Sequence, residues 1–244
     1  MSDPKRHQQD RREVRVSPPP EAGDVTRLLK AGNGLLKPDV WVVSLNGRET
    51  VWKTWHRRPA IERATFGRWL AGREARIIRK LKGIPGVPDF ISQPHPWTVE
   101  MSLLDAESVP EVKRNGDLTP EYFERLWVMI SEMHARCIVH GDLRRRNLLR
   151  SREDHSRPLI VDFTQCGHFR EPLRWPRRAM FEGMKRVDRI TFLKLKKWYL
   201  EQDQMTPTEL AELEDVPWHL SLGRALRKKV YRPLRRKLTG HKGS

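Results

Sequence analysis

The feature that most constrains this chain is a polar stretch, HGDLRRRN (140–147), which follows directly on a long segment with a helical apolar pattern. Fifteen residues after Asn147, the apolar run 159–161 ends in Asp162. An Asp and an Asn five positions apart on a loop, with a second Asp after a nearby strand, suit phosphoryl transfer. Asp142 can orient an acceptor hydroxyl and take its proton, while Asn147 and Asp162 offer the hard oxygen ligands that Mg²⁺ prefers.

The first hundred residues have the pattern of a small antiparallel sheet. Two runs rich in Val and Trp flank Asn46-Gly47, a dipeptide that predicts a tight hairpin because both residues tolerate a positive φ. The strands expected in this half are 40–45, 50–55, one before Gly32, one around Phe90 and one over 98–103.

The segment between these strands is predicted to be helical, because apolar residues recur at helical spacing. They are Phe66, Trp69, Leu70, Ile77, Ile78 and Leu81. Gly72 is a point at which this helix could divide, and the Gly- and Pro-rich run 83–88 ends it. Glu74 lies four residues from apolar neighbours on either side, so it shares their inward face. A buried carboxylate needs a partner, and we expect it to be Lys53, which lies inside an otherwise apolar or Thr strand.

The second half is predicted to be mainly helical. Thr119 can cap a helix that begins at Pro120, and Glu121 suits its positive end. Its apolar face consists of Tyr122, Phe123, Leu126, Ile130, Met133 and Cys137. Further helices are expected over about 188–202 and 207–214.

Several other polar or reactive residues have structural interpretations. Asp188 would either cap the helix that it opens or brace the loop 140–147, and we prefer the cap. His140 is expected to support that loop from beneath, and His134 and His155 are expected to be surface or packing residues. Cys137, on an apolar helix face, is most simply a small core residue.

The charge balance is strongly basic, with 48 Lys and Arg against 31 Asp and Glu, or +17. Such a chain attracts polyanions: nucleotide phosphates, nucleic acid or an anionic membrane surface. Apolar residues make up 37%, enough for a core, and no run approaches the roughly 18–20 apolar residues of a membrane span. The N-terminus has no apolar stretch, and two cysteines are too few for a disulfide framework. A reduced, cytoplasmic setting is expected.

HGDLRRRN followed by VDF resembles the catalytic loop and metal-binding strand of the protein-kinase-like superfamily. The HGD form resembles RIO kinases, lipopolysaccharide-core (Kdo/heptose) kinases and aminoglycoside phosphotransferases, and DFTQ (162–165) is similar to the RIO version. The resemblance covers about residues 24–200. It implies an α+β, two-lobed kinase-like fold, with a small antiparallel sheet plus one helix and then a minimal helical C-lobe. The predicted parts are a disordered tail (1–22), an N-lobe (23–104), a C-lobe (105–220) and a basic segment (221–244).

The resemblance implies ATP and Mg²⁺ or Mn²⁺ as cofactors. It assigns Lys53 the role of holding the nucleotide α- and β-phosphates, oriented by Glu74. Arg144 stands where many kinases carry a Lys that neutralises the transferred phosphate. The remaining nucleotide-binding candidates are Gly32 and Gly34 as a glycine-rich loop and the backbone near Glu100 and Met101 beside the adenine.

The sequence departs from the motifs of eukaryotic-type protein kinases in three places. No GxGxxG is present, Thr164 replaces the glycine of DFG, and no APE motif follows Asp162. Only 82 residues follow Asp162, which leaves a minimal C-lobe. A eukaryotic-type protein kinase with a phosphorylation-controlled activation loop is therefore disfavoured.

The expected activity is ATP-dependent transfer of the γ-phosphate to an acceptor hydroxyl, with Ser or Thr of a protein as the preferred acceptor. The alternatives are a lipopolysaccharide-core sugar at the inner membrane and a non-catalytic nucleotide-binding scaffold. The segment 221–244 carries nine Lys or Arg and no acid, with Leu222, Leu226 and Val230 every four residues. It could lie on an anionic membrane, bind RNA, or pack on the C-lobe as a solvated helix. Peripheral association with the inner face of the membrane is thus an alternative location, and the oligomeric state is open.

Overall fold

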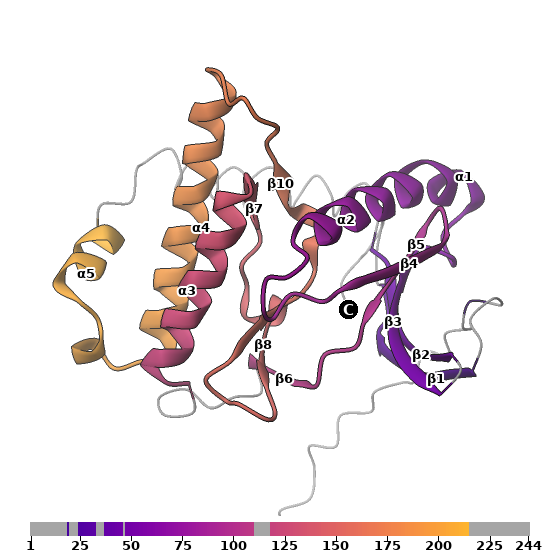
Figure 1. The fold of residues 1–244 in the computed structure, drawn as a ribbon, viewed down its shortest axis with the longest axis horizontal. Coiled ribbons are helices and arrows are strands. Elements are labelled where there is room, and N and C mark those ends of the chain that lie inside the picture. Colours follow the sequence, from indigo (N-terminus) through magenta and orange to yellow (C-terminus); the bar gives the residue numbers. More distant parts are fainter. Residues whose placement is uncertain (1–18, 20–23, 33–36, 46, 110–117, 215–244) are drawn as a thin grey trace, which may run out of the picture. The chain divides into compact units, whose positions relative to one another are not determined.

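The computed structural model describes residue 19 and the ranges 24–32, 37–45, 47–109 and 118–214 (Figure 1). Gly34, most of the predicted tail 1–22 and the whole basic segment 221–244 lie outside the described residues. The chain divides into two compact units, the first made of 1–71 and 92–101 and the second of 72–91 and 102–244. The lobe boundaries expected from the resemblance stay a prediction.

A five-stranded sheet in the order β1-β2-β3-β5-β4 organises the N-terminal half. Its strands are β1 Asp24–Lys30, β2 Asp39–Leu45, β3 Arg48–Thr54, β4 Phe90–His95 and β5 Thr98–Ser102. The β2–β3 hairpin keeps an unbroken register from Asp39↔Thr54 to Leu45↔Arg48, and Gly47 at its turn has φ +77°. The five predicted strands and the hairpin are confirmed, because the dipeptide and the β-branched runs act together.

The predicted helix is present but differs from the prediction in two ways. It consists of α1 Ala60–Glu62, a π-helical turn Arg63–Gly67 and α2 Arg68–Lys80. The expectation that Gly72 divides the helix is wrong, because Gly72 lies inside the continuous α2. Phe66 and Trp69 are largely exposed, whereas Leu70, Ile77 and Ile78 are buried. Phe66 lies inside the π turn, whose wider winding takes it off the apolar stripe, whereas Trp69 lies on the exposed side of α2 itself.

The second unit is built on long helices with short strand pairs. The helices are α3 Pro120–Ala135, α4 Arg177–Tyr199 and α5 Pro207–Glu214. The strands are β6 Ala106–Ser108, β7 Ile138–Val139, β8 Leu148–Ser151, β9 Pro158–Ile160 and β10 Gly167–His168, in the antiparallel orders β6-β8-β9 and β10-β7. Figure 1 shows α3 and α4 side by side, where Phe123 and Trp127 pack against Phe192.

The start of α3 follows the prediction. The Thr119 hydroxyl accepts a hydrogen bond from the Tyr122 N–H at 3.3 Å, and Pro120 occupies the first helical position. The apolar face is buried as expected, and Cys137, beyond the helix end, is also buried. The helix therefore offers a fixed support for the loop that follows it.

The start of α4 was predicted wrongly. The helix begins at Arg177, eleven residues before the expected position, and α5 matches its predicted range. Two ion pairs join α5 to α4: Lys196 contacts Glu209 at 2.7 Å, and Arg189 contacts Glu212 at 2.9 Å. In the part of the chain that the structure describes, every helix is too short or too polar to span a membrane.

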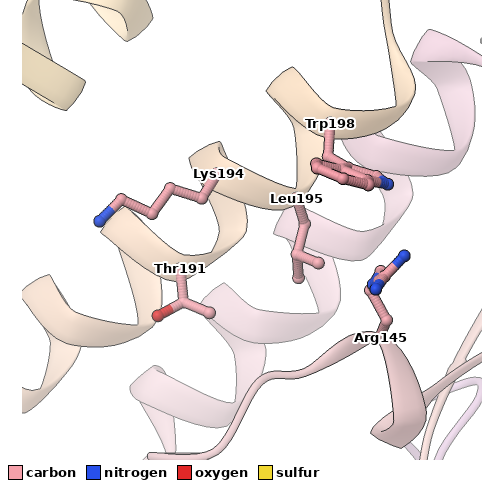
Figure 2. Close-up of a pocket in the computed structure, with 5 residues that line it drawn as sticks. All are labelled: Arg145, Thr191, Lys194, Leu195 and Trp198. Carbon is pink, nitrogen blue, oxygen red and sulfur yellow. The ribbon is translucent and has the colours of Figure 1, made fainter. Parts of the chain in front are cut away.

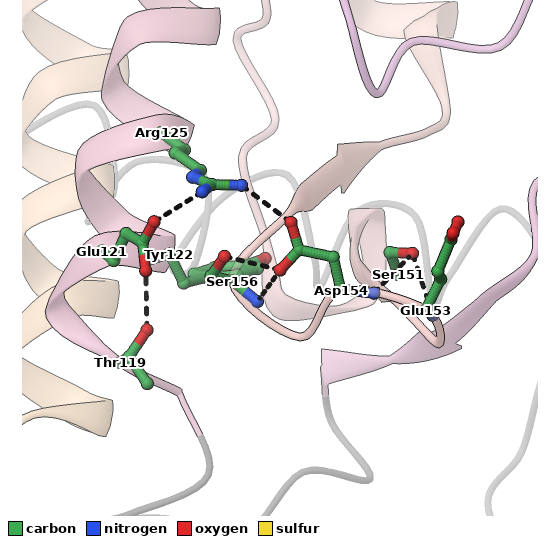
Figure 3. A network of polar contacts seen from close by, with 8 residues as sticks. All are labelled: Thr119, Glu121, Tyr122, Arg125, Ser151, Glu153, Asp154 and Ser156. Carbon is green, nitrogen blue, oxygen red and sulfur yellow. Dashed lines mark hydrogen bonds and ion pairs between the residues drawn. The ribbon is translucent and has the colours of Figure 1, made fainter.

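The β8–β9 connection is tied to α3 by a polar network (Figure 3). The Arg125 guanidinium contacts Glu121 at 2.5 Å and Asp154 at 2.8 Å. Asp154 also accepts hydrogen bonds from the N–H and hydroxyl of Ser156, and Ser151 accepts from the Asp154 N–H. Asn147 directly precedes β8 and Asp162 follows β9 by two residues, so both lie at the end of the strand pair away from this network.

Candidate active site

The loop 140–147 lies between β7 and β8 and ends in a 3₁₀ turn, Arg145–Asn147. Gly141 has φ +70°, in the left-handed region that glycine adopts without strain. This conformation explains a glycine after His140.

Asp188 braces this loop from beneath. Its carboxylate accepts hydrogen bonds at 2.8 Å from the N–H of His140 and at 2.8 Å from the N–H of Gly141. His134 Nε2 lies 3.1 Å from the same carboxylate, and Asp188 is 1% exposed. The preferred cap interpretation is therefore wrong, because Asp188 lies in the middle of α4 and the alternative, a brace, is correct. Its spacing of four residues from the buried Phe192 was the sequence signal for an inward position.

His140 supports the loop as a neutral ring. Its Nδ1 accepts a hydrogen bond from the Asp142 N–H at 3.3 Å, and its ring packs 5.7 Å from that of Phe163. Burial lowers the pKa of His140 below its usual 6.5. Because it is 1% exposed, His140 agrees with the predicted structural role beneath the loop.

Asp142 and Asn147 are joined directly. The Asn147 Nδ2 donates to the Asp142 carbonyl at 2.9 Å and lies 3.5 Å from its Oδ2. The Arg144 Nε donates to the other carboxylate oxygen of Asp142. Because Nδ2 of Asn147 is turned to Asp142, its Oδ1 is the atom that could coordinate a cation. Arg144 is exposed and Asp142 is partly exposed, so this side of the loop can meet an acceptor.

Backbone pairing brings Asp162 to the same place. The Val161 N–H donates to the Asn147 carbonyl at 2.9 Å, and Leu148 pairs with Ile160 in the β8–β9 ladder. Asp162 itself has φ 69° and ψ 71°. A non-glycine residue in this region costs about 1–3 kcal/mol and is typical of functional sites.

Glu74 and Thr164 connect α2 to the segment after Asp162. Glu74 Oε1 accepts from the Phe163 N–H at 3.1 Å, and its Oε2 lies 3.0 Å from the Thr164 hydroxyl. The same hydroxyl lies 2.9 Å from Asp162 Oδ1. Glu74 is 1% exposed, as its inward position predicts. Thr164 is the functional candidate that sequence reasoning missed, because it was read only as a departure from DFG.

The remaining candidates belong to the first unit. Lys53 is 5% exposed on β3, and its predicted pairing with Glu74, which joins the two units, stays a prediction. The Glu100 carboxylate accepts hydrogen bonds from Thr50 at 2.9 Å and from Ser92 at 2.6 Å. Met101 is buried beside it in β5, and contact of either residue with adenine stays a prediction.

Gly32 is held at the base of the short loop before β2. Its N–H donates to Asp39 Oδ1 at 2.7 Å, and Asp39 is paired with Arg57 at 2.7 Å. A Cβ at Gly32 would lie 2.4 Å from the Lys37 carbonyl oxygen, so only glycine fits. Gly34 falls outside the described residues.

The donor set fits a small hard cation. Asn147 and Asp162 would supply two oxygen ligands, and Mg²⁺ commonly takes one or two protein ligands and completes its shell with water and phosphate oxygens. Among the described residues, no group of three or more His, Cys, Asp or Glu is gathered as a metal site.

No family model and no curated protein matches the chain. Among solved structures, it is similar to the Rio2 kinase–ADP/Mg²⁺–phosphoaspartate complex from Chaetomium thermophilum, with 22% identity and a TM-score of 0.51. That likeness covers 79% of this chain and 62% of the Rio2 chain. A second Rio2 kinase structure from the same organism has 22% identity, a TM-score of 0.49 and coverage of 79% and 64%.

These likenesses concern the fold. The chain has an α+β, protein-kinase-like fold, which confirms the predicted fold class. It spans 62% of the length of the Rio2 chain, or somewhat less than two thirds.

Proposed function

We propose that this chain is an ATP-dependent phosphotransferase that moves the γ-phosphate to an acceptor hydroxyl. The observation that carries the proposal is that hydrogen bonds join the segments that carry Asp142, Asn147 and Asp162. Asn147 is bonded to Asp142 at 2.9 Å through its amide, and its carbonyl is bonded at 2.9 Å to the residue before Asp162. The similar Rio2 structure is a complex with ADP and Mg²⁺, which supports the same ligands here.

Asp142 is the candidate base. Its carboxylate is partly exposed, so an acceptor hydroxyl can reach it and give up its proton there. Asn147 holds the Asp142 backbone in place. Arg144, bonded to that carboxylate, is exposed enough to turn toward a phosphate and neutralise its charge.

Asn147 and Asp162 are the candidate metal ligands. Bound Mg²⁺ or Mn²⁺ would neutralise charge on the nucleotide phosphates. The left-handed backbone of Asp162 and the hydrogen bond from Thr164 hold its carboxylate in one orientation. Lys53 as the phosphate ligand, Glu74 as its partner, and Gly32 and Gly34 with Glu100 and Met101 around the nucleotide complete the proposal.

Ser or Thr of a protein is the proposed acceptor, because DFTQ (162–165) resembles the RIO motif and its Thr164 is engaged with two carboxylates of the site. A lipopolysaccharide-core sugar stays the alternative acceptor. We keep the cytoplasm as the expected location. Contact of 221–244 with RNA or with the inner face of the membrane is an expectation for residues beyond those described.

Transfer from γ-labelled ATP with Mg²⁺ tests the proposal. Full-length protein, Asp162→Ala and Lys53→Met would each be incubated alone, with cell lysate and with a membrane extract. Label in protein that both variants abolish is expected, and label confined to the lipid-sugar fraction would replace the protein acceptor by a sugar. ATP binding without any transfer would contradict the proposal and favour a scaffold.

A further inference from the structure

A shallow hollow of about 200 Å³ lies beside the candidate active site, within the second unit. It is lined by Arg145 from the loop 140–147 and by Thr191, Lys194, Leu195 and Trp198 from α4 (Figure 2). Nothing in the proposed chemistry uses these residues. We call this set the α4 hollow.

The hollow has an apolar centre between two cations. Figure 2 shows Leu195 in the middle, with the Arg145 guanidinium on one side and the Lys194 side chain on the other. The guanidinium lies 5.1 Å from the centroid of the Trp198 ring, close enough for a cation–π contact. This contact favours a position of the Arg145 charge at the edge of the hollow.

The hollow is within reach of the reacting hydroxyl. Arg145 follows Asp142 by three residues, and three residues span at most about 10 Å. A group seated beside Arg145 is therefore within a few residues of the accepted hydroxyl in an extended peptide.

The lining selects among acceptors. It includes two cations, one hydroxyl from Thr191 and no carboxylate, so its charge favours an anionic group and repels a basic one. An apolar floor between cations is complementary to an apolar side chain with acidic neighbours. Resting on the proposed function, we propose that the α4 hollow binds such an acidic peptide segment of the acceptor, within a few residues of the accepted Ser or Thr.

A positional scan of peptides tests this. The peptides carry one Ser and an Asp-Leu-Asp triplet, moved from four residues before the Ser to four after it. With full-length protein, ATP and Mg²⁺, we expect one register to raise kcat/KM about tenfold over an Ala-Leu-Ala peptide, since one or two partly exposed ion pairs give an effect of this order.

Charge reversal on α4 supplies the matched control. Lys194→Glu should remove the preference for Asp-Leu-Asp. Of the peptides Lys-Leu-Asp and Asp-Leu-Lys in the same register, one should regain activity with this variant, because Arg145 keeps its positive charge. Arg178→Glu makes the same charge change at the exposed other end of α4 and should leave the preference intact. Both variants change exposed residues, and thermal unfolding would show that they fold.

Three outcomes would contradict binding of an acidic segment in the α4 hollow. A preference that is independent of register, or that both variants reduce equally, would show general attraction to a basic chain and overturn the inference. Phosphorylation of a sugar but of no peptide would also overturn it while leaving phosphotransfer intact. If no phosphate is transferred, anisotropy of the labelled peptides decides, because equal affinity for the wild type and Lys194→Glu contradicts the binding site independently of the proposed function.

Discussion

The two sides of the loop 140–147 differ in burial and in hydrogen-bond partners. On its inner side, Asp188 and His140 are each 1% exposed, and the Asp188 carboxylate accepts two backbone N–H groups at 2.8 Å. On its outer side, the Asp142 carboxylate is partly exposed and faces the exposed Arg144. One short loop therefore has a side that is fixed by burial and a side that can exchange partners.

This difference in burial gives the carboxylates of Asp188 and Asp142 different roles. Asp188 is surrounded by donors that belong to the folded chain, so any ligand would have to displace backbone hydrogen bonds. The Asp142 carboxylate lies near two side chains. One is the buried Asn147, and the other is the exposed Arg144, which an acceptor can displace. The inner side should govern stability and the outer side turnover.

The largest expected effect is on the outer side. Asp142→Asn keeps the shape of the side chain but removes the base, so phosphate transfer should fall by at least about 100-fold. The free energy of unfolding should change by less than about 1 kcal/mol, since Asp142 is not fully buried. Transfer from labelled ATP and urea unfolding measure the two quantities. Near-normal turnover would remove Asp142 from the site.

The next effect is on the inner side. Asp188→Asn replaces a carboxylate oxygen by an amide that cannot accept a backbone N–H, so one buried donor loses its partner. We expect a loss of about 2–3 kcal/mol in the free energy of unfolding, measured by urea.

Glu182→Gln is the matched control for Asp188. It removes the same charge from the exposed part of α4, where Glu182 is paired only with Lys185 in the part of the chain described, and it should cost less than about 1 kcal/mol. Equal losses for the two variants would show that charge, rather than the hydrogen bonds of Asp188, sets the stability of the inner side.

Thr164→Val should have a smaller effect that falls on turnover more than on stability. The hydroxyl lies 3.0 Å from Glu74 and 2.9 Å from Asp162, and it has one hydrogen to give. Valine keeps its shape but leaves two carboxylates without this donor. We expect about a tenfold loss of kcat/KM, with Thr164→Ser restoring most of it. Unchanged activity in the valine variant would exclude a positioning role.

The sequence predicted the parts of the molecule in which several local signals agree. The β2–β3 hairpin has a turn dipeptide between two β-rich runs, and α3 has a cap, a proline and an acid in its first three positions. The order of Asp142, Asn147 and Asp162 along the chain was also readable. Their proximity was expected from the chemistry and the kinase resemblance and not from a strand pattern, because the β8–β9 pairing that brings them together has strands of only four and three residues.

The errors have one common source, a local pattern that was read without its tertiary context. The first turns of α4, from Arg177, are strongly basic, so the helical periodicity is weak there and Asp188 appeared to begin the helix. Thr164 offered no pattern at all, since its role depends on Glu74, ninety residues earlier in the chain. The π turn Arg63–Gly67 likewise exposes Phe66, which simple periodicity placed inward.

The smallest expected effect concerns pH and the inner side of the loop. Burial lowers the pKa of His140 in the folded chain below its usual 6.5, so as pH falls through about 6.5 the unfolded chain binds a proton that the folded chain does not. The free energy of unfolding should therefore decrease as pH falls from about 6.5 to the pKa of His140 in the folded chain. This loss should be absent above pH 6.5. Urea unfolding at several pH values measures the slope.

The variant His140→Asn isolates this contribution. Its side-chain oxygen can still accept the Asp142 N–H, but it does not titrate, so the decrease in stability below pH 6.5 should be shallower than in the wild type whatever its starting stability. An identical slope would assign the pH dependence to other groups. The neutral His140 ring would then not be the link between the two sides of the loop. That link is expected because the ring accepts the Asp142 N–H and packs against Phe163.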